Sequence, residues 1–256
     1  MCGRFAIALI AGHADTAEWL RIERDAPPPD WLDGWPPDPA WPSPDQPPAG
    51  PWPRPSWNIA PTQSIAAITA GETPDAPRRV IAARWGLVPR WWNKPLAAFK
   101  ATTFNARSEE AAGKPMFRDA WARARCLIPA AGYYEWTGKA GAKTPWYITR
   151  RSNRPGLCFA GLWAEARVDG ARLVSATILT TAAGEATRHL HPRSPVVLEE
   201  EDFDAWLTGG AGEGGEAAAL MRPIEDARTV VQEVDRAVGN VRNDDPGMVA
   251  PVGLGL

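Results

Sequence analysis

The sequence has little cysteine, little histidine and no nucleotide-binding glycine loop, and each absence excludes a class of protein. Its 256 residues include three cysteines, too few and too odd in number for a disulfide framework. No CxxC pair or HExxH motif indicates a metal site, so we expect no metal and no cofactor. No GxxxxGKS/T or GxGxxG loop is present, which excludes the common nucleotide-hydrolysing and dinucleotide-binding classes.

Long apolar runs are also missing. No segment reaches the roughly 20 apolar residues that a membrane-spanning helix needs. The amino-terminal region lacks the basic stretch followed by an apolar one that is typical of a secretory leader. We therefore expect a soluble protein of the cytoplasm, without a membrane partner, and associated with the nucleoid if it is bacterial. The 45% hydrophobic content suffices for a buried core, and we expect one domain over residues 1–256 and a monomer.

Charge is distributed unevenly, although the net charge is only −2. Residues 78–125 contain eleven basic and three acidic side chains, a balance of +8, whereas residues 195–256 contain four basic and thirteen acidic ones, a balance of −9. Such asymmetry is typical of a basic face for a polyanion and an acidic remainder that maintains solubility. A solvated surface with scattered arginines explains the charge alone equally well.

Strand signals dominate the chain. Strands are predicted at 5–10, 64–69, 79–85, 126–128, 133–136, 146–149, 157–163, 173–180 and 229–234. Helices are predicted at 15–24, 105–111, 115–124, 199–207 and 216–221. Because the two kinds of element do not alternate regularly, the pattern favours an α+β domain with a curved, mostly antiparallel β core flanked by a few short helices.

Residues 27–55 interrupt this pattern, because thirteen of the twenty-nine are proline. Tryptophans lie among these prolines, at Trp31, Trp35, Trp41 and Trp52. We interpret the segment as an inserted, polyproline-like surface loop, and a partner-recognition segment is the alternative. We also expect a loose carboxyl-terminal tail from about residue 244.

The chain begins Met1-Cys2-Gly3-Arg4-Phe5, so removal of Met1 would leave a cysteine with an amine and a thiol on adjacent carbons. Such an aminothiol condenses with an aldehyde to an imine, and the thiolate then closes a thiazolidine ring. The amine titrates at about 8 and the thiol at about 8.5, so both are usable near neutral pH. Taken alone, Cys2 is better interpreted as an ordinary second residue, since many chains carry a small residue after Met1, and only the rest of the sequence can favour the reactive aminothiol.

Residues 85–95 combine tryptophans with cations and turn-forming residues. An exposed tryptophan stacks on a base while a neighbouring arginine neutralises a phosphate, and stacking contributes roughly 1–3 kcal/mol per base. This pattern indicates contact with single-stranded nucleic acid through Arg90, Trp91 and Trp92. The alternative assigns Trp85 and one of the other two tryptophans to the core, and for Trp85 we favour it.

Asn105 and Arg107 lie two residues apart at the expected start of the helix over 105–111. An amide and a guanidinium at a helix amino terminus suit a phosphate or a sugar oxygen. Capping of that helix by Asn105 alone explains the pair equally well.

Two groups could transfer protons. Glu135 is a lone carboxylate in an apolar and aromatic run, where burial would raise its pKa, although the solvent face of a strand is the alternative. His191 follows the strand at 173–180 and lies close to arginines, as a general acid or as a surface residue. His13 we interpret as a surface residue.

Taken in order, eight segments resemble the SRAP family, the SOS-response-associated peptidase domain proteins. They are MCGRFA, WNIAP, WGLVPRWW, NARSE, CLIPAAGYYEW, FAGLW, TILTTAA and HPRSPVVL. The resemblance extends from Cys2 to about Asn243 and is interrupted mainly by the insertion at 27–55. No single segment is decisive, but eight in register are highly specific.

The resemblance implies an abasic-site processing protein of the DNA damage response, whose mature amino-terminal cysteine captures the ring-opened aldehyde of an abasic site in single-stranded DNA. A thiazolidine cross-link would then protect the lesion. By motif, Cys2 is the nucleophile, Glu135 lies beside its amine and His191 assists proton transfer. Asn105 and Arg107 match residues that hold the sugar and phosphate around the lesion.

The same resemblance assigns Arg4, Arg90, Trp91 and Trp92 to DNA binding near a kink or junction. The chain departs from the expected pattern at Pro192 and Ser194, which leaves the position of His191 open. Two other functions remain: a peptidase or self-processing hydrolase that uses Cys2, with lyase activity on the cross-link also implied, and a non-covalent module that binds single-stranded DNA.

Overall fold

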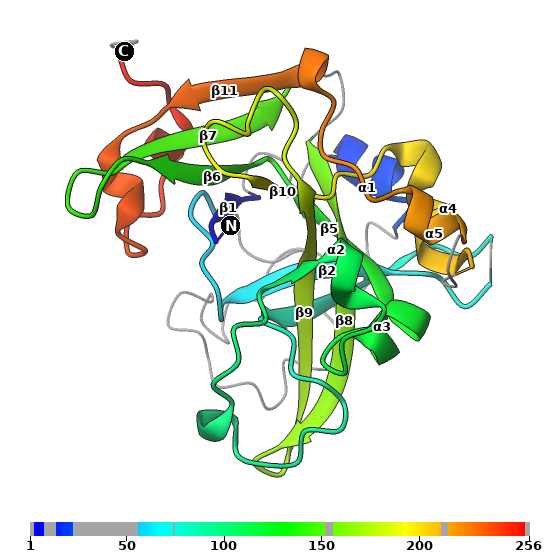
Figure 1. Ribbon diagram of the computed structural model, residues 1–256. Helices are drawn as coiled ribbons and strands as arrows, with labels where there is room; N and C mark the ends of the chain where they lie inside the picture. The colour runs from blue at the N-terminus through cyan, green and yellow to red at the C-terminus, as the bar shows by residue number, and fades with distance from the viewer. Residues whose placement is uncertain are drawn as a thin grey trace.

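The computed structural model describes residues 3–7, 14–22, 56–73, 75–151, 156–210 and 215–253. Three of the predictions concern residues outside these ranges, namely Cys2, His13 and the inserted loop at 27–55. Among the described residues, strands predominate and the helices are short, as predicted (Figure 1). None of the helices described is long and apolar enough to cross a membrane.

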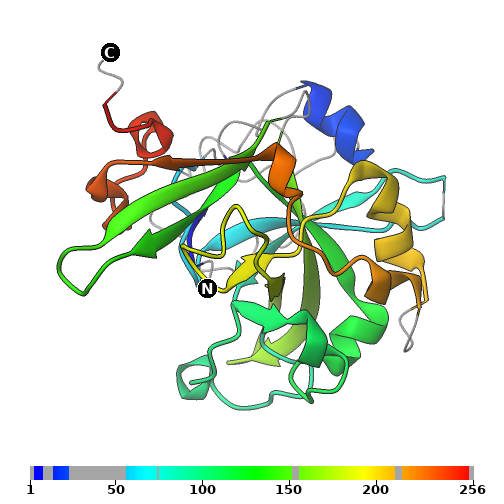
Figure 2. The same ribbon diagram turned by 45° about the horizontal axis from the view of Figure 1, so that its top comes forward.

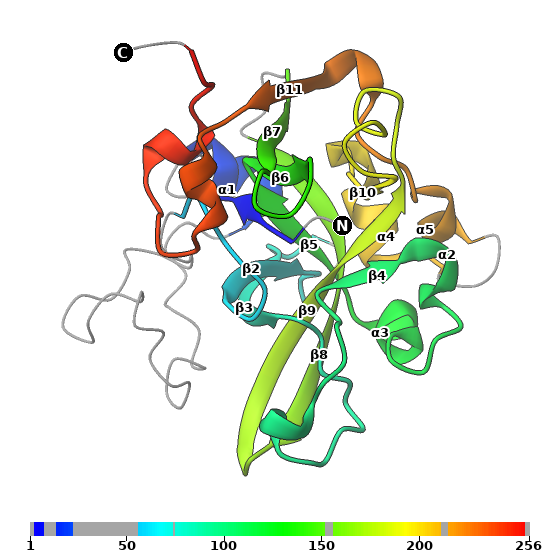
Figure 3. The same ribbon diagram turned by 60° about the vertical axis from the view of Figure 1, so that its left-hand side comes forward.

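Five strands close into a small barrel at the centre of the fold (Figure 3). They are β2 (Ser64–Thr69), β3 (Arg79–Trp85), β5 (Arg125–Ala130), β8 (Leu157–Val168) and β9 (Ala171–Ala182). In the order β9-β3-β2-β5-β8 each strand pairs with the next, and β8 pairs again with β9, which closes the ring. Within the ring only β3 and β9 are parallel, so the curved and mostly antiparallel core is confirmed.

A second, antiparallel sheet packs against one end of the barrel (Figure 1). Its strands, in order, are β1 (Phe5–Ala6), β6 (Gly132–Thr137), β7 (Thr144–Arg150) and β11 (Thr229–Glu233). Two short strands, β4 (Asn105–Arg107) and β10 (Arg193–Pro195), pair with β9 beyond the ring. The carboxyl-terminal end of β9 therefore extends beyond the ring and pairs there with β4 and β10.

The helices gather on one side of the barrel (Figure 2). They are α1 (Ala14–Leu20), α2 (Ser108–Ala111), α3 (Arg118–Arg123), α4 (Phe203–Thr208) and α5 (Glu216–Ala219). Short 3₁₀ turns form at Leu96–Ala98, Glu200–Asp202, Asp226–Arg228, Arg236–Gly239 and Pro246–Val249. The helices bury Trp19, Trp121 and Trp206 against the outer face of the barrel strands, which removes their apolar surface from water.

Most predicted strands match the structure, and those at 64–69 and 79–85 match at both ends. The predicted helix over 105–111 is wrong in its first half, because residues 105–107 form a strand and the helix begins at Ser108. The hairpin β8–β9 is longer than predicted and extends below the barrel (Figure 3).

The expected loose tail from about residue 244 is packed as far as residue 253. Asp245 accepts a hydrogen bond from the amide of Gly247 and starts a 3₁₀ turn. Met248 in that turn is buried, and the Gln232 side chain donates to the carbonyl of Val249 at 2.8 Å. A capped turn and a buried thioether thus hold the first part of this segment against the protein.

The short strand β1 anchors the start of the chain. Its backbone pairs with the segment before β2, where Phe5 and Ile59 exchange hydrogen bonds of 3.2 and 2.8 Å, and on its other side with β6. The Phe5 ring is fully buried and meets Trp85 edge-on, with 5.0 Å between ring centroids. The ring closes one end of the barrel, and Arg4 before it accepts a hydrogen bond from the amide of Tyr134 in β6 at 3.0 Å.

The buried side chain of Asn58 joins three separate segments. Its Oδ1 accepts a hydrogen bond from the Arg4 guanidinium at 2.7 Å. Its Nδ2 donates to the carbonyls of Val238, Asn240 and Asn243 at 3.1, 3.1 and 2.7 Å. One amide therefore ties the amino-terminal residues to the segment after β11.

Replacement of Asn58 by alanine should lower the free energy of unfolding by about 2–3 kcal/mol, because buried carbonyls and a guanidinium lose their partner. Chemical denaturation measures the change. The control is Asn93→Ala, at an exposed asparagine, which should change stability by less than about 0.5 kcal/mol. Equal effects of the two substitutions would contradict a central role for Asn58.

Candidate active site

Glu135 lies in β6, next to Tyr134. The backbone amide of Tyr134 donates a hydrogen bond to the carbonyl of Arg4 at 3.0 Å, which holds Arg4 beside this strand. Only 5% of Glu135 is exposed, so the carboxylate is buried as one interpretation predicted and the solvent-face alternative is wrong. Burial raises its pKa to about 7, and the positive charge of the chain's amino terminus opposes part of this rise. A carboxyl group with such a pKa can both accept and donate a proton near neutrality.

His191 is half-buried in the loop between β9 and β10. The backbone amide of Arg193 lies 3.0 Å from its Nδ1 atom and donates to it. Burial lowers the pKa of the imidazole, and the positive charges of the amino terminus and of Arg193 act in the same direction. The ring is therefore neutral at pH 7, with its Nδ1 edge held by the backbone.

Ser194, one of the two departures from the expected pattern, helps to shape this loop. It is buried, and its hydroxyl lies 3.0 Å from that of Thr187. The amides of Leu190 and His191 both donate to the carbonyl of Thr187. A small hydroxyl residue fits this position because it bonds across the loop that carries the histidine.

Asn105 and Arg107 are not at a helix start. Both lie in β4, which pairs in parallel with β9, and the register sets Asn105 opposite Ile178 and Arg107 opposite Thr180. Alternation along a strand directs their side chains to the same face. Asn105 lies in β4, two residues before Arg107, which is the residue that precedes α2, so capping of this helix by Asn105 is also wrong. Pairing with β9 overrides the local helix signal.

The ion pair between Arg193 and Glu109 joins the histidine loop to α2. The guanidinium donates to both carboxylate oxygens at 2.7 Å and also to the carbonyl of Thr180. Sequence reasoning missed this contact, although each residue lies within a segment that carries the family resemblance. The pair links the segments that contain His191 and Arg107, which flank the carboxyl-terminal end of β9 on its two edges.

The Arg4 side chain makes several contacts inside the protein. Its guanidinium bonds to Asn58 and, at 2.9 Å, to the carbonyl of Val238, and it lies over the Trp136 ring at 5.7 Å. Burial lowers its pKa. These contacts position the segment that follows Cys2, and the contact of Arg4 with DNA stays a prediction.

The tryptophans of residues 85–95 occupy three environments. Trp85 is fully buried, as we favoured. Trp92 is half-buried and packs edge-on against Phe99, at 5.0 Å between centroids. Trp91 is 53% exposed, and its indole N–H donates to the carbonyl of Pro115 at 3.3 Å. Arg90 beside it is also exposed, so Trp91 offers an aromatic face next to a cation.

The two cysteines within the described part of the chain are poor nucleophiles. Cys126 and Cys158 are fully buried in the barrel wall, and burial raises the pKa of both thiols. Their thiolates are therefore scarce at neutral pH. The described residues also contain no group of three or more His, Cys, Asp or Glu that could hold a metal ion.

The family model of SOS response associated peptidase (SRAP) matches residues 1–241. The chain belongs to the SRAP family. This membership confirms the resemblance that eight segments carried in the sequence.

Curated relatives of the SRAP chain share one description. YoqW of Bacillus subtilis is 31% identical over 77% of this chain and 86% of its own length. YedK of Escherichia coli is 28% identical over 98% and 100%, and HMCES of Gallus gallus is 29% identical over 79% and 68%. Each of the three is named an abasic site processing protein.

Solved structures agree with the fold. A crystal structure of a protein from Bordetella bronchiseptica matches with a TM-score of 0.69 and 26% identity, over 91% of this chain and all of that one. The SRAP fold described above is therefore the fold of the family.

The raised pKa of Glu135 predicts a specific pH dependence of stability. Its carboxyl has a higher pKa folded, about 7, than the ordinary 4.5, so folding takes up a proton between these values. The free energy of unfolding should fall as pH rises from about 4.5 to about 7, by up to about 1.4 kcal/mol per pH unit. Urea denaturation across this range measures the slope.

Glu135→Gln should remove this part of the slope, whereas Glu233→Gln, at an exposed glutamate of β11, should leave it unchanged. Identical slopes for wild type and Glu135→Gln would contradict the raised pKa.

Proposed function

We propose that this SRAP protein captures abasic sites in single-stranded DNA through a thiazolidine formed by Cys2 after removal of Met1. The observation that carries the proposal is the buried Glu135, whose pKa of about 7 suits proton transfer, on the strand that pairs with β1. The names of the relatives support the substrate class, since each is an abasic site processing protein.

The first bond would form between the α-amine of Cys2 and the aldehyde carbon of the ring-opened sugar. Glu135 would take a proton from the ammonium and return it to the hydroxyl that leaves as water, which gives an imine. The thiol would then add to the imine carbon, and the nitrogen would take up the thiol proton. One aldehyde and one aminothiol thus yield one thiazolidine and one water.

Neutral His191 would assist opening of the sugar hemiacetal, because an imidazole exchanges protons readily near pH 7. The positive face of residues 78–125 would hold the strand, with Arg107 and Arg90 near phosphates and Asn105 near the sugar. Ring closure by the adjacent thiol is intramolecular, and well-oriented reactions of this kind reach effective molarities of about 10⁵ M or more.

The central test mixes the protein with a single-stranded oligonucleotide that carries one abasic site and separates the products on a denaturing gel. Wild type should give a slowly migrating cross-link, and Cys2→Ala should give none. Cys158→Ala is the matched control, since its thiol is buried, and should cross-link like wild type. Glu135→Gln should slow the reaction at least tenfold.

Intact mass of the wild-type protein accompanies this test, because a retained Met1 would block the amine. A cross-link that survives in Cys2→Ala would exclude the proposed chemistry. Normal non-covalent binding without any covalent product would instead favour the binding-module alternative.

Trp91→Ala should weaken binding of undamaged single-stranded DNA about 5- to 150-fold, the equivalent of one lost stacking contact. Fluorescence anisotropy with a labelled oligonucleotide measures the dissociation constant. Affinity should also fall as salt rises, because phosphate contacts release counterions. The control Val252→Ala removes another exposed apolar side chain and should bind like wild type. Unchanged binding by Trp91→Ala would contradict a stacking role.

A further inference from the structure

The end of the barrel opposite Phe5 is open and forms a cavity of about 370 Å³. All five barrel strands contribute to its lining, which makes it the mouth of the barrel. The cavity is remote from the candidate active site, because Val174 in the mouth lies four positions before Ile178, the partner of Asn105, along β9, a span of roughly 13 Å. Barrel mouths are common ligand sites, and this volume lies within their usual range.

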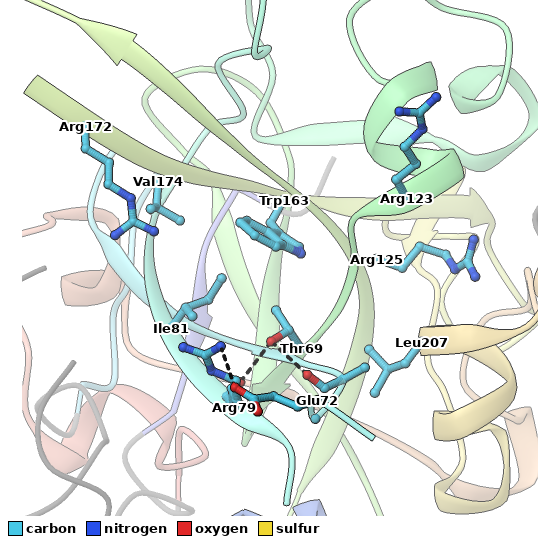
Figure 4. Close-up of a pocket in the computed structure, with 12 residues that line it drawn as sticks. Thr69, Glu72, Arg79, Ile81, Arg123, Arg125, Trp163, Arg172, Val174 and Leu207 are labelled. Atoms are coloured by element: carbon cyan, nitrogen blue, oxygen red, sulfur yellow. Dashed lines mark hydrogen bonds and ion pairs between the residues drawn. The ribbon is translucent and has the colours of Figure 1, made fainter. Parts of the chain in front are cut away.

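The floor of the mouth is apolar and aromatic. Ile81 of β3, Trp163 of β8 and Val174 of β9 point into the barrel, and the Trp163 ring lies near the centre of the cavity (Figure 4). Ile81 and Trp163 are only half-buried, so the mouth leaves apolar surface exposed that a ligand would cover. A half-buried indole in a cavity suits a flat ring of the ligand.

The rim is strongly basic. Four arginines and one glutamate line the cavity: Arg79, Arg123, Arg125, Arg172 and Glu72. Arg172 also forms an ion pair with Glu165 at 2.9 Å. When Glu165 is counted with the lining residues, the four positive charges still exceed the two negative ones by two. Such a rim complements an anion.

Two of the arginines are available to a ligand. Figure 4 shows the guanidinium groups of Arg79 and Arg172 on the same side of Trp163, next to Ile81 and Val174. Both side chains are more than half exposed, and their ion pairs with Glu72 and Glu165 lie at the surface. Surface pairs contribute only about 0–1 kcal/mol, so a phosphate can replace them at little cost.

The guanidinium of the buried Arg125 is held by backbone carbonyls instead of a carboxylate. Its guanidinium donates to the backbone carbonyls of Trp121, Trp206 and Gly209. Its guanidinium points away from Trp163 in Figure 4, so the arginines that can reach a ligand in the mouth are the exposed ones.

We propose that the open mouth of the barrel binds a nucleotide phosphate, with the phosphate between Arg79 and Arg172 and the base against Trp163. Guanidinium groups bind phosphate oxygens through paired charge-assisted hydrogen bonds, and the indole and aliphatic floor accepts the base. The nucleotide can be free or part of a DNA strand, since both offer the same groups.

Isothermal titration calorimetry with dAMP tests the free form. Wild type should bind dAMP in low salt, and deoxyadenosine, which lacks the phosphate, at least tenfold more weakly. Arg79→Gln/Arg172→Gln should lose at least tenfold in affinity for dAMP. Both sites are exposed, so thermal unfolding should be unchanged. The control Arg151→Gln/Arg242→Gln removes the same charge from exposed positions outside the cavity and should bind like wild type.

Anisotropy with an undamaged oligonucleotide tests the strand form. If dAMP does not bind but the double variant, unlike its control, loses tenfold in DNA affinity, the phosphate belongs to a strand. The proposal would be overturned if the double variant bound both dAMP and the oligonucleotide as tightly as wild type does. It would also be overturned if wild type bound neither of them. Because dAMP has no aldehyde, this outcome is independent of whether Cys2 forms a cross-link.

Discussion

The docking of β1 against the end of the barrel is the constraint on which the candidate site depends. Phe5 is buried among Trp85, Phe159 and Tyr133, and its backbone is held on one side by Ile59 and on the other by β6. A terminal strand of two residues has too few backbone bonds to be stable alone. Aromatic burial supplies the missing stabilisation, because a buried phenylalanine contributes about 1.5–3 kcal/mol.

Burial shifts the pKa values of the two proton-transfer candidates, Glu135 and His191, in opposite directions. Desolvation disfavours charge, so it raises the pKa of the Glu135 carboxyl and lowers that of the His191 imidazole. The Glu135 carboxyl, with a pKa of about 7, therefore exchanges protons near neutrality, whereas the His191 imidazole is held in its neutral form. Glu135 owes its burial to the sheet that covers the barrel, and His191 owes its position to a loop closed by Thr187 and Ser194.

The barrel also has two functionally different ends. The Phe5 end is filled by aromatic rings and carries the candidate active site, whereas the opposite end is left open around Trp163 with arginines at its rim. Five strands enclose too little space for a continuous channel, so side chains such as Ala83 and Ala176 fill the middle. The two ends can therefore bind different ligands without interfering.

The order of the amino acids was enough to predict the family, from eight segments in register, and most strands, from short apolar runs such as those of β2 and β3. It also indicated that Glu135 could be buried, but alternation allowed either face. The tertiary structure places Glu135 on the buried face of its strand. It also places Asn105 and Arg107 in a strand, where the sequence predicted the start of a helix. Pairing with β9, the Asn58 network and the Arg193–Glu109 ion pair join residues far apart in the chain, and no local pattern encodes such contacts.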